Sequence, residues 1–251
     1  MNLSEAIMSG HSHAKTIKHQ KDIADAKKGS VFSKIGRLIT IAAKEAGGDA
    51  TTNSKLRLAI DQAKKFNMPK ENIERAIKKG VGELTGEKLE EISFEGFGPG
   101  GIALIIEGIT DNKNRTLGEI KVILNQNGGK LAGEGAVKWL FDRKGVITIN
   151  SKLQTPNSKN DELEIAAIES GADDVKWFDN ELEVYTKPEG LEKIKKSLEE
   201  KQIKIDSASL DWVAKEEIEI SEKDKEATEK LFEVIDENDA VNDIYSNFKK
   251  N

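Results

Sequence analysis

Three histidines lie within nine residues near the start of the chain, at His11, His13 and His19. Imidazole is a common zinc ligand, but structural zinc sites normally take four Cys or His ligands. The chain has no cysteine and no further histidine. These histidines therefore fit better as polar side chains of a basic segment, and the sequence predicts no metal site and no cofactor.

Two short segments have residue types that could hold a phosphate. Gly96-Phe-Gly-Pro-Gly-Gly101 is rich in glycine, but it lacks the Gly-Lys-Ser/Thr ending of a P-loop and lies between two predicted strands. We therefore expect a tight hairpin there. Thr110-Asp-Asn-Lys-Asn-Arg-Thr116 lies at a helix start, where backbone N–H groups with Lys113 and Arg115 could hold an anion.

A simple N-cap by Asp111 or Asn112 explains the second segment equally well. Carboxylates and serines are numerous, but their spacing marks no acid–base pair, nucleophile or triad. The sequence therefore predicts a protein that is not an enzyme, and an enzyme with an anion pocket at one of these two segments is the weaker alternative.

The charge of the chain is divided unevenly. Residues 1–80 hold 16 Lys and Arg against 8 Asp and Glu, whereas residues 81–251 hold 23 against 37. A basic leading part can lie against a polyanion, which the acidic remainder would repel. The sequence therefore predicts nucleic-acid contact by the first part. The candidate residues are Lys15, Lys18, His19, Lys21, Lys27, Lys28, Lys34, Arg37, Lys44, Arg57, Lys64, Lys65, Arg75, Lys78 and Lys79.

The leading part has the pattern of a small helical domain behind a basic arm. Residues 10–29 hold too few apolar side chains to form a core. Ser30 is a candidate N-cap for a helix that ends at Gly47-Gly48, Asn53 can cap a second helix, and Pro69 suits the first turn of a third. On the first helix Lys34, Arg37 and Lys44 form a stripe that we expect on an outer face, away from the apolar stripe.

After Gly80 strands alternate with helices. We expect strands at 91–97 and 101–109, a helix at 113–126, and a β-β-α-β-β-α-β unit typical of a ferredoxin-like sandwich. Its segments are strands at 137–141 and 146–149, a helix at 161–170, strands at 175–178 and 182–185, a helix at 188–201 and a strand at 203–205. A strand at 210–213, a helix after Ser221 and a last strand at 241–248 then return to the first unit.

The expected fold class is therefore α+β, with an N-terminal three-helix domain followed by two α/β domains, the last ferredoxin-like and inserted in the middle one. The domains would be 1–80, then 81–132 plus 207–251, with 133–206 inserted. No apolar run approaches the roughly 18 residues of a membrane span, and no secretory signal precedes the helices. Because the chain has no cysteine and can form no disulfide, we expect a cytoplasmic protein. Oligomeric state and the choice between Met1 and Met8 as start stay open.

A series of short motifs appears in a fixed order along the chain, and as a set it resembles the YebC/PmpR family of bacterial regulators, related to the mitochondrial translational activator of cytochrome oxidase. The chain departs from the family pattern at His13-Ala14, where Lys-Trp is usual. The motifs are Gly10-His-Ser, Ile17-Lys-His19, Asp25-Ala-Lys, Phe32-Ser-Lys34, Asn67-Met-Pro-Lys, Asn72-Ile-Glu-Arg-Ala-Ile-Lys-Lys-Gly80, Glu95-Gly-Phe-Gly-Pro-Gly-Gly101, Thr110–Thr116, Gly128-Gly129, Gly135-Ala-Val-Lys-Trp-Leu-Phe141 and Val241-Asn-Asp-Ile-Tyr-Ser-Asn247.

The resemblance implies three domains and nucleic-acid contact without enzyme activity. Some family members are DNA-binding transcriptional regulators, and others are ribosome-associated factors that relieve stalling at proline-rich sequences. A basic helical face serves promoter DNA and ribosomal RNA alike, so composition does not separate the two. We therefore expect a DNA-binding transcriptional regulator, with the translation factor as the alternative and promoter DNA, ribosomal RNA or the ribosome as the partner.

Overall fold

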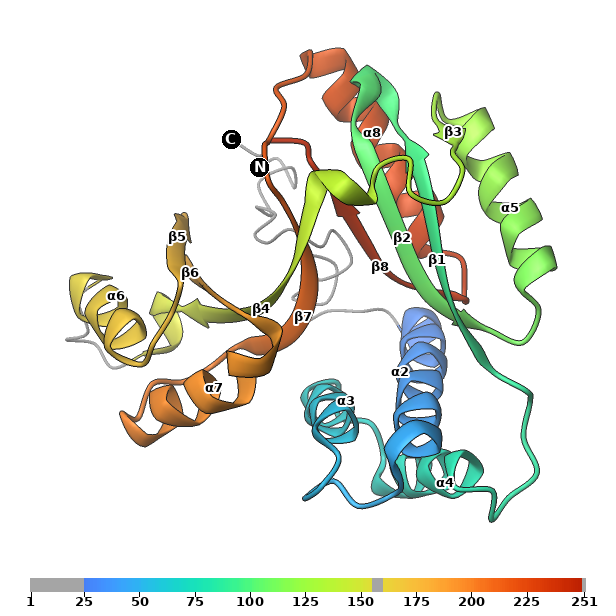
Figure 1. Ribbon diagram of the computed structural model, residues 1–251. Coiled ribbons are helices and arrows are strands. Elements are labelled where there is room, and N and C mark those ends of the chain that lie inside the picture. Colours follow the sequence, from blue (N-terminus) through green and yellow to red (C-terminus); the bar gives the residue numbers. More distant parts are fainter. Residues whose placement is uncertain (1–24, 155–159, 250–251) are drawn as a thin grey trace.

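Three structural units follow one another in the computed structural model, which describes residues 25–154 and 160–249 (Figure 1). A group of three helices comes first, and two antiparallel four-stranded sheets with covering helices come after it. The predicted α+β class is confirmed. Among the described helices, none is long and apolar enough to cross a bilayer.

The first unit consists of α2 (Asp25–Ala46), α3 (Ser54–Lys65) and α4 (Lys70–Gly80). Its core contains Ile35 and Ile39 of α2, Leu56 of α3 and Ile73 of α4, all buried. The predicted cap at Asn53 is confirmed, because its side chain accepts from the backbone N–H of Leu56 and donates to two carbonyls at the end of α2.

The predicted N-cap at Ser30 is wrong. The first helix already begins at Asp25, five residues earlier. The Ser30 hydroxyl instead donates to the Asp239 carboxylate (2.8 Å), which follows α8 near the end of the chain. Ser30 therefore links the helical unit to the segment that follows α8.

The first sheet has the strand order β3-β1-β2-β8, so a strand from the end of the chain lies beside a strand from its middle. On one face of it Leu104 and Ile106 pack against α5 and α8, which contribute Leu124 and Phe232 to the same core. The predicted hairpin between the first two strands is confirmed, with Phe97 opposite Ala103. The elements are β1 (Glu90–Phe97), β2 (Ala103–Thr110), α5 (Lys113–Gln126), β3 (Lys130–Leu131), α8 (Glu222–Asp236) and β8 (Val241–Ser246).

The second sheet has the order β5-β6-β4-β7 with every pair antiparallel. Two helices cover one face, over a core that includes Ile147, Leu163, Val184 and Ile194. The chain order β-α-β-β-α-β with this strand order is the ferredoxin-like arrangement. The elements are β4 (Phe141–Asn150), α6 (Asn160–Glu169), β5 (Asp174–Phe178), β6 (Glu181–Thr186), α7 (Leu191–Glu200) and β7 (Ser207–Ala214).

Two strand predictions in this unit are wrong. The predicted hairpin at 137–149 is instead one long strand, β4, preceded by a single 3-10 turn at Lys138–Leu140. The predicted strand at 203–205 is a loop, and the last strand of the unit starts at Ser207. Since β7 pairs with β4, the segment after residue 206 contributes to the second sheet before the chain returns to the first. The remaining 3-10 turns are Pro99–Gly101, Ser151–Leu153 and Pro188–Gly190.

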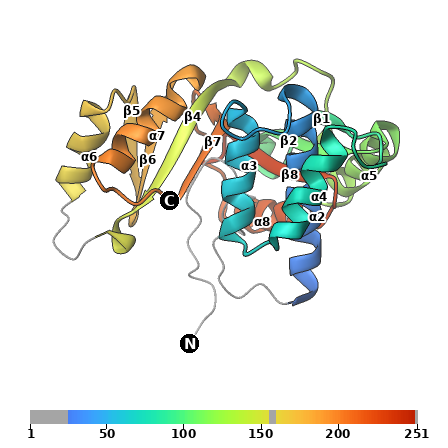
Figure 2. The ribbon, with the colours of Figure 1, turned by 90° about the horizontal axis from the view of Figure 1, so that it is seen from below.

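The domain limits predicted from the sequence otherwise stay a prediction. The helical unit packs on the first sheet through a small apolar cluster of Ile41, Leu89 and Ile109. Its helix α3 faces the second sheet, beside β7 and α7 (Figure 2).

Candidate nucleic-acid interface

The fifteen predicted cationic contacts fall into three groups. Lys15, Lys18, His19 and Lys21 lie outside the described residues, as do His11 and His13. Lys27 lies in α2, but its side chain is outside the description too. Lys28 is exposed at the mouth of the cleft described below and already has an interaction partner. The remaining residues divide into those held by the protein's own polar groups and those that point into solvent.

The three cations of the stripe on α2 donate hydrogen bonds to other parts of the protein. The Lys34 ammonium binds both the carbonyl and the carboxylate of Asp236, the last residue of α8, and its side chain is only 12% exposed. The Arg37 guanidinium donates to the Asp239 carbonyl (2.9 Å), and Lys44 donates to the Leu89 carbonyl (3.3 Å). The expectation that this stripe lies on an outer face is therefore wrong for Lys34 and Arg37, which contact the first-sheet unit, whereas Lys44 is exposed despite its contact with Leu89.

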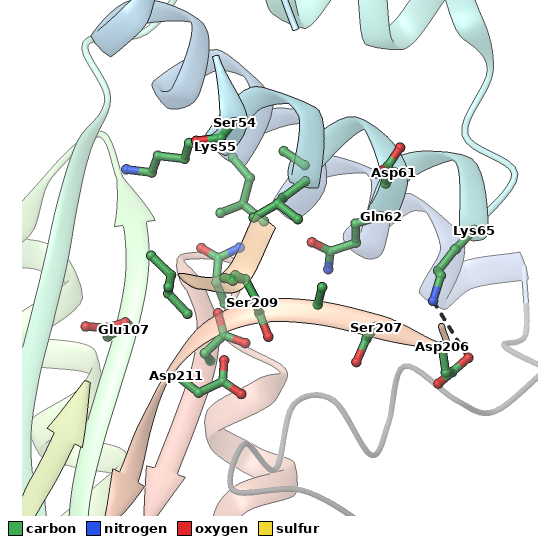
Figure 3. Close-up of a pocket in the computed structure, with 18 of the residues that line it drawn as sticks. Ser54, Lys55, Asp61, Gln62, Lys65, Glu107, Asp206, Ser207, Ser209 and Asp211 are labelled. Carbon is green, nitrogen blue, oxygen red and sulfur yellow. Dashed lines mark ion pairs between the residues drawn. The ribbon is translucent and has the colours of Figure 1, made fainter. Parts of the chain in front are cut away.

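Three ion pairs join α3 to the second-sheet unit. Arg57 Nη2 lies 2.6 Å from Glu192 Oε2, and Asp61 Oδ2 lies 3.0 Å from Lys195 Nζ. Along α3 a positive residue precedes a negative one, and along α7 a negative residue precedes a positive one, so each charge faces its opposite. Lys65 Nζ adds a looser contact, 3.7 Å from Asp206 Oδ1 (Figure 3). We call these three ion pairs the α3–α7 latch.

A third cation of α3, Lys55, also binds carboxylates of the protein. Burial alone would lower the pKa of its ammonium, but hydrogen bonds to Glu45 (2.8 Å) and Glu91 (2.7 Å) outweigh burial and raise that pKa. Lys55 therefore stays charged and links the end of α2 to β1.

Four of the predicted cations remain in solvent. Arg75, Lys78 and Lys79 follow at helical spacing on α4, and Lys64 lies in the last turn of α3; all four are exposed. Within residues 25–154 and 160–249, none of the four takes part in an ion pair. We call these four residues the α4 cation patch. Arg75, Lys78 and Lys79 share one face of α4, and phosphates could meet any of the four cations without first breaking an ion pair of the described residues.

A cleft of 1320 Å³ separates α3 from the two sheets. Nine carboxylate side chains and five cations line it, so its charge is opposite to that of the α4 cation patch. Figure 3 shows Ser207, Ser209 and Asp211 along β7 beneath α3, with Asp206 just before the strand and Glu107 of β2 beside it. This acidic lining would repel a polyanion, and nucleic acid is expected on the outside of the helical unit.

The two phosphate-like segments have other roles. The glycine run forms the β1–β2 hairpin, with Gly100 and Gly101 at positive φ. At the start of α5 the Asn112 side chain accepts from the backbone N–H of Arg115 (3.1 Å), which confirms the N-cap. The Arg115 guanidinium binds Asp111, so this cation is already neutralised. Among the described residues, no group of three or more His, Asp or Glu side chains is placed to hold a metal ion.

Glu95 was not singled out by its sequence, yet it organises a surface loop. It is 4% exposed, and its carboxylate accepts from the backbone N–H groups of Gly135 (2.7 Å), Val137 (2.7 Å) and Lys138 (2.9 Å). Burial alone would raise the pKa of this carboxyl, but the three N–H groups and the Lys138 charge outweigh it and hold the pKa below its ordinary value. An ionised carboxylate therefore fixes the loop that leads into β4.

Two protein-family models match successive parts of this chain. Residues 12–83 match the family model of the TACO1/YebC protein N-terminal domain, and residues 89–248 match that of the TACO1/YebC second and third domain. These two models together span the helical unit and both sheets.

Full-length relatives are similar throughout. The chain is 47% identical to a probable transcriptional regulatory protein of Caldanaerobacter subterraneus, over 96% of this chain and 98% of that one. It is 48% identical to a protein of the same description from Thermoanaerobacter pseudethanolicus, over 96% of each. A conserved hypothetical protein from Aquifex aeolicus has a crystal structure that matches with a TM-score of 0.85 and 41% identity, covering 93% of this chain and 95% of that one. The chain belongs to the TACO1/YebC family.

Proposed function

We propose that this protein is a non-enzymatic regulator of gene expression that binds nucleic acid through its helical unit, and that it acts as a DNA-binding transcriptional regulator. The α4 cation patch carries the proposal. Lys64, Arg75, Lys78 and Lys79 are exposed and make no described ion pair, on a unit whose other described cations are mostly held by internal contacts. Clustered exposed cations are what phosphate neutralisation requires.

The names of the relatives support the transcriptional role. Several proteins that match over 96% of this chain are described as probable transcriptional regulatory proteins. The alternative is a ribosome-associated translation factor that relieves stalling at proline-rich sequences. Phosphates of ribosomal RNA would meet the same cations, so the patch serves both roles, and the two differ in the nucleic acid bound inside the cell.

Crosslinking in cells followed by sequencing of the attached nucleic acid separates these roles. Promoter DNA recovered with the wild-type protein supports the transcriptional role, and ribosomal RNA supports the translation factor. Recovery should fall with the triple variant Arg75→Gln, Lys78→Gln, Lys79→Gln, because that variant removes three of the four exposed cations. Equal recovery of nucleic acid with both proteins, or none with either, would contradict the proposal.

A matched control variant neutralises three cations outside the helical unit. Lys121, Lys193 and Lys223 are exposed lysines of the two sheet units, and none forms an ion pair within the described residues. Changing all three to Gln alters the net charge of the protein by the same amount. This control variant should recover nucleic acid as the wild type does.

A further inference from the structure

The loop between β3 and β4 carries the most exposed large apolar side chain of the described residues. Trp139 is 67% exposed, whereas Val137, two residues before it, is fully buried against the first sheet. Exposing an indole forgoes the free energy of burying a large apolar surface. The sequence motif Gly135–Phe141 contains this tryptophan, and the proposed phosphate contacts leave it unused.

The backbone around Trp139 is fixed from several directions. The buried Glu95 carboxylate accepts three N–H groups of residues 135–138, and the carbonyl of Trp139 accepts from the Lys215 ammonium (2.9 Å). The indole N–H donates to the Ala136 carbonyl (3.1 Å), which fixes the orientation of the ring. The loop therefore presents the ring in one orientation, so a ligand that stacks on it need not order the loop first.

The surroundings favour an anionic ligand. Residues 130–144 hold four cations against two carboxylates, in a part of the chain (residues 81–251) that holds 23 against 37. Lys138 lies over the ring of a different tryptophan, Trp212, at 5.0 Å from its centre. Lys215 donates to the Trp139 carbonyl, and its ion pair with Asp142 (3.5 Å) is half-exposed and therefore weak. An exposed aromatic ring on a segment with an excess of cations suits a single-stranded nucleic acid, because every base has a face that stacks.

A protein partner fits this surface less well. Energetically important residues at protein interfaces usually lie within a patch that becomes fully dry, surrounded by other contacts. The neighbours of Trp139 in the loop are Gly133, Glu134, Gly135 and Ala136, all exposed, and no second large apolar side chain is exposed in residues 132–138. An isolated ring suits a single flat base better than an extended protein surface.

We propose that Trp139 is a stacking platform for an unpaired nucleobase, in RNA or in single-stranded DNA, and that Lys138 and Lys215 attract the flanking phosphates. The inference rests on the proposed function and adds a second contact on the segment between β3 and β4, which lies well away from α4 (Figure 1). Such a contact would favour single strands over duplexes, because a base within a duplex is already stacked on its neighbours.

The test measures binding of an oligouridylate, an oligothymidylate and a duplex to full-length variants. Trp139→Ala should weaken binding of the single strands by about tenfold, the lower part of the range expected for one stacked base, and should leave duplex binding unchanged. Trp139→Phe keeps a ring and should lose less. Ile168→Ala removes another exposed apolar side chain, 60% exposed on α6, and should change nothing. Comparing the two single strands shows whether RNA or DNA is the source of the base.

Tryptophan fluorescence gives an independent readout. A stacked base should quench Trp139 and shield it from iodide, and both effects should disappear in Trp139→Phe. If Trp139→Ala binds the single strands as tightly as the wild type, or if iodide still reaches Trp139 in the saturated complex, the stacking proposal is wrong while the α4 proposal stands. If the wild type binds none of the three probes, both proposals fail.

Discussion

The Glu95 carboxylate is the residue on which the loop before β4 depends. Its three backbone N–H donors come from residues 40 to 43 positions later in the chain. A carboxylate that loses its ionised form can no longer accept all three hydrogen bonds, and buried N–H groups left without an acceptor are costly. The residue therefore links the charge of one side chain to the position of a surface tryptophan.

Replacement of Glu95 by Gln should lower the free energy of unfolding by about 2 kcal/mol at neutral pH, because the amide NH₂ would face the backbone donors. The pKa of Glu95 lies below its ordinary value of 4.5 in the folded protein. Its contribution is therefore complete above that ordinary pKa and is lost as the pH falls through the folded value. Urea denaturation from neutral to acidic pH should show this loss in the wild type and a flatter profile in the variant. Parallel profiles would contradict the account.

Sequence reasoning could identify the cations but not their partners. The type and spacing of Arg75, Lys78 and Lys79 place them on the outside of a helix, and the structure agrees. Lys34 and Arg37 have the same character, yet their partners are more than 200 residues later in the chain. Trp139 lies within a run of apolar residues that suggests a buried strand, and nothing local indicates that Glu95 holds it outside.

At the scale of elements, three of the helix caps predicted from the sequence are confirmed, whereas the cap at Ser30 and the turn at residues 142–145 are not. Asn53, Asn112 and Ser221 all cap the helices that follow them. The sequence predicts a break within β4 because Asp142-Arg-Lys-Gly145 has the composition of a turn. In the structure Gly145 is needed for a different reason, since a Cβ there would lie 2.8 Å from Thr186 Cγ2 and 3.0 Å from Leu191 Cβ.

Gly145→Ala should consequently destabilise the second sheet by about 1 to 3 kcal/mol, because the added methyl group would displace β6 or the start of α7. Gly118→Ala is the matched control, since a Cβ at that position in α5 has nothing within 4 Å and should stabilise the helix by up to about 1 kcal/mol. Chemical denaturation of the two variants measures the difference. A turn at Gly145 would tolerate the alanine, and equal stabilities would then favour the hairpin over the continuous strand.

At the scale of the whole molecule, the α3–α7 latch closes one side of the acidic cleft. Arg57 and Lys65 belong to it, so two of the predicted phosphate contacts are neutralised while it is closed. Partly exposed ion pairs contribute roughly 0 to 1 kcal/mol each, and salt weakens them. The separation of the two units across the cleft should therefore respond to ionic strength.

The absence of cysteine allows two specific fluorescent labels, at Thr52→Cys and Lys196→Cys. Reversing both charges on α7, with Glu192→Arg and Lys195→Asp, should increase the distance between the labels, because like charges then face each other. Adding Arg57→Asp and Asp61→Arg restores opposite charges and should restore the distance. The same separation in all three proteins would mean that the latch does not control the cleft.

The central claim is that the α4 cation patch binds nucleic-acid phosphates, and the salt dependence of binding tests it most directly. With four phosphate contacts, the affinity of the wild type for a labelled nucleic acid should fall about a hundredfold between roughly 50 and 200 mM salt. The Arg75→Gln, Lys78→Gln, Lys79→Gln variant should lose about three units of the logarithmic slope, whereas the variant changed at Lys121, Lys193 and Lys223 should keep it. Identical slopes for all three proteins, or a wild-type affinity that does not change with salt, would contradict the account.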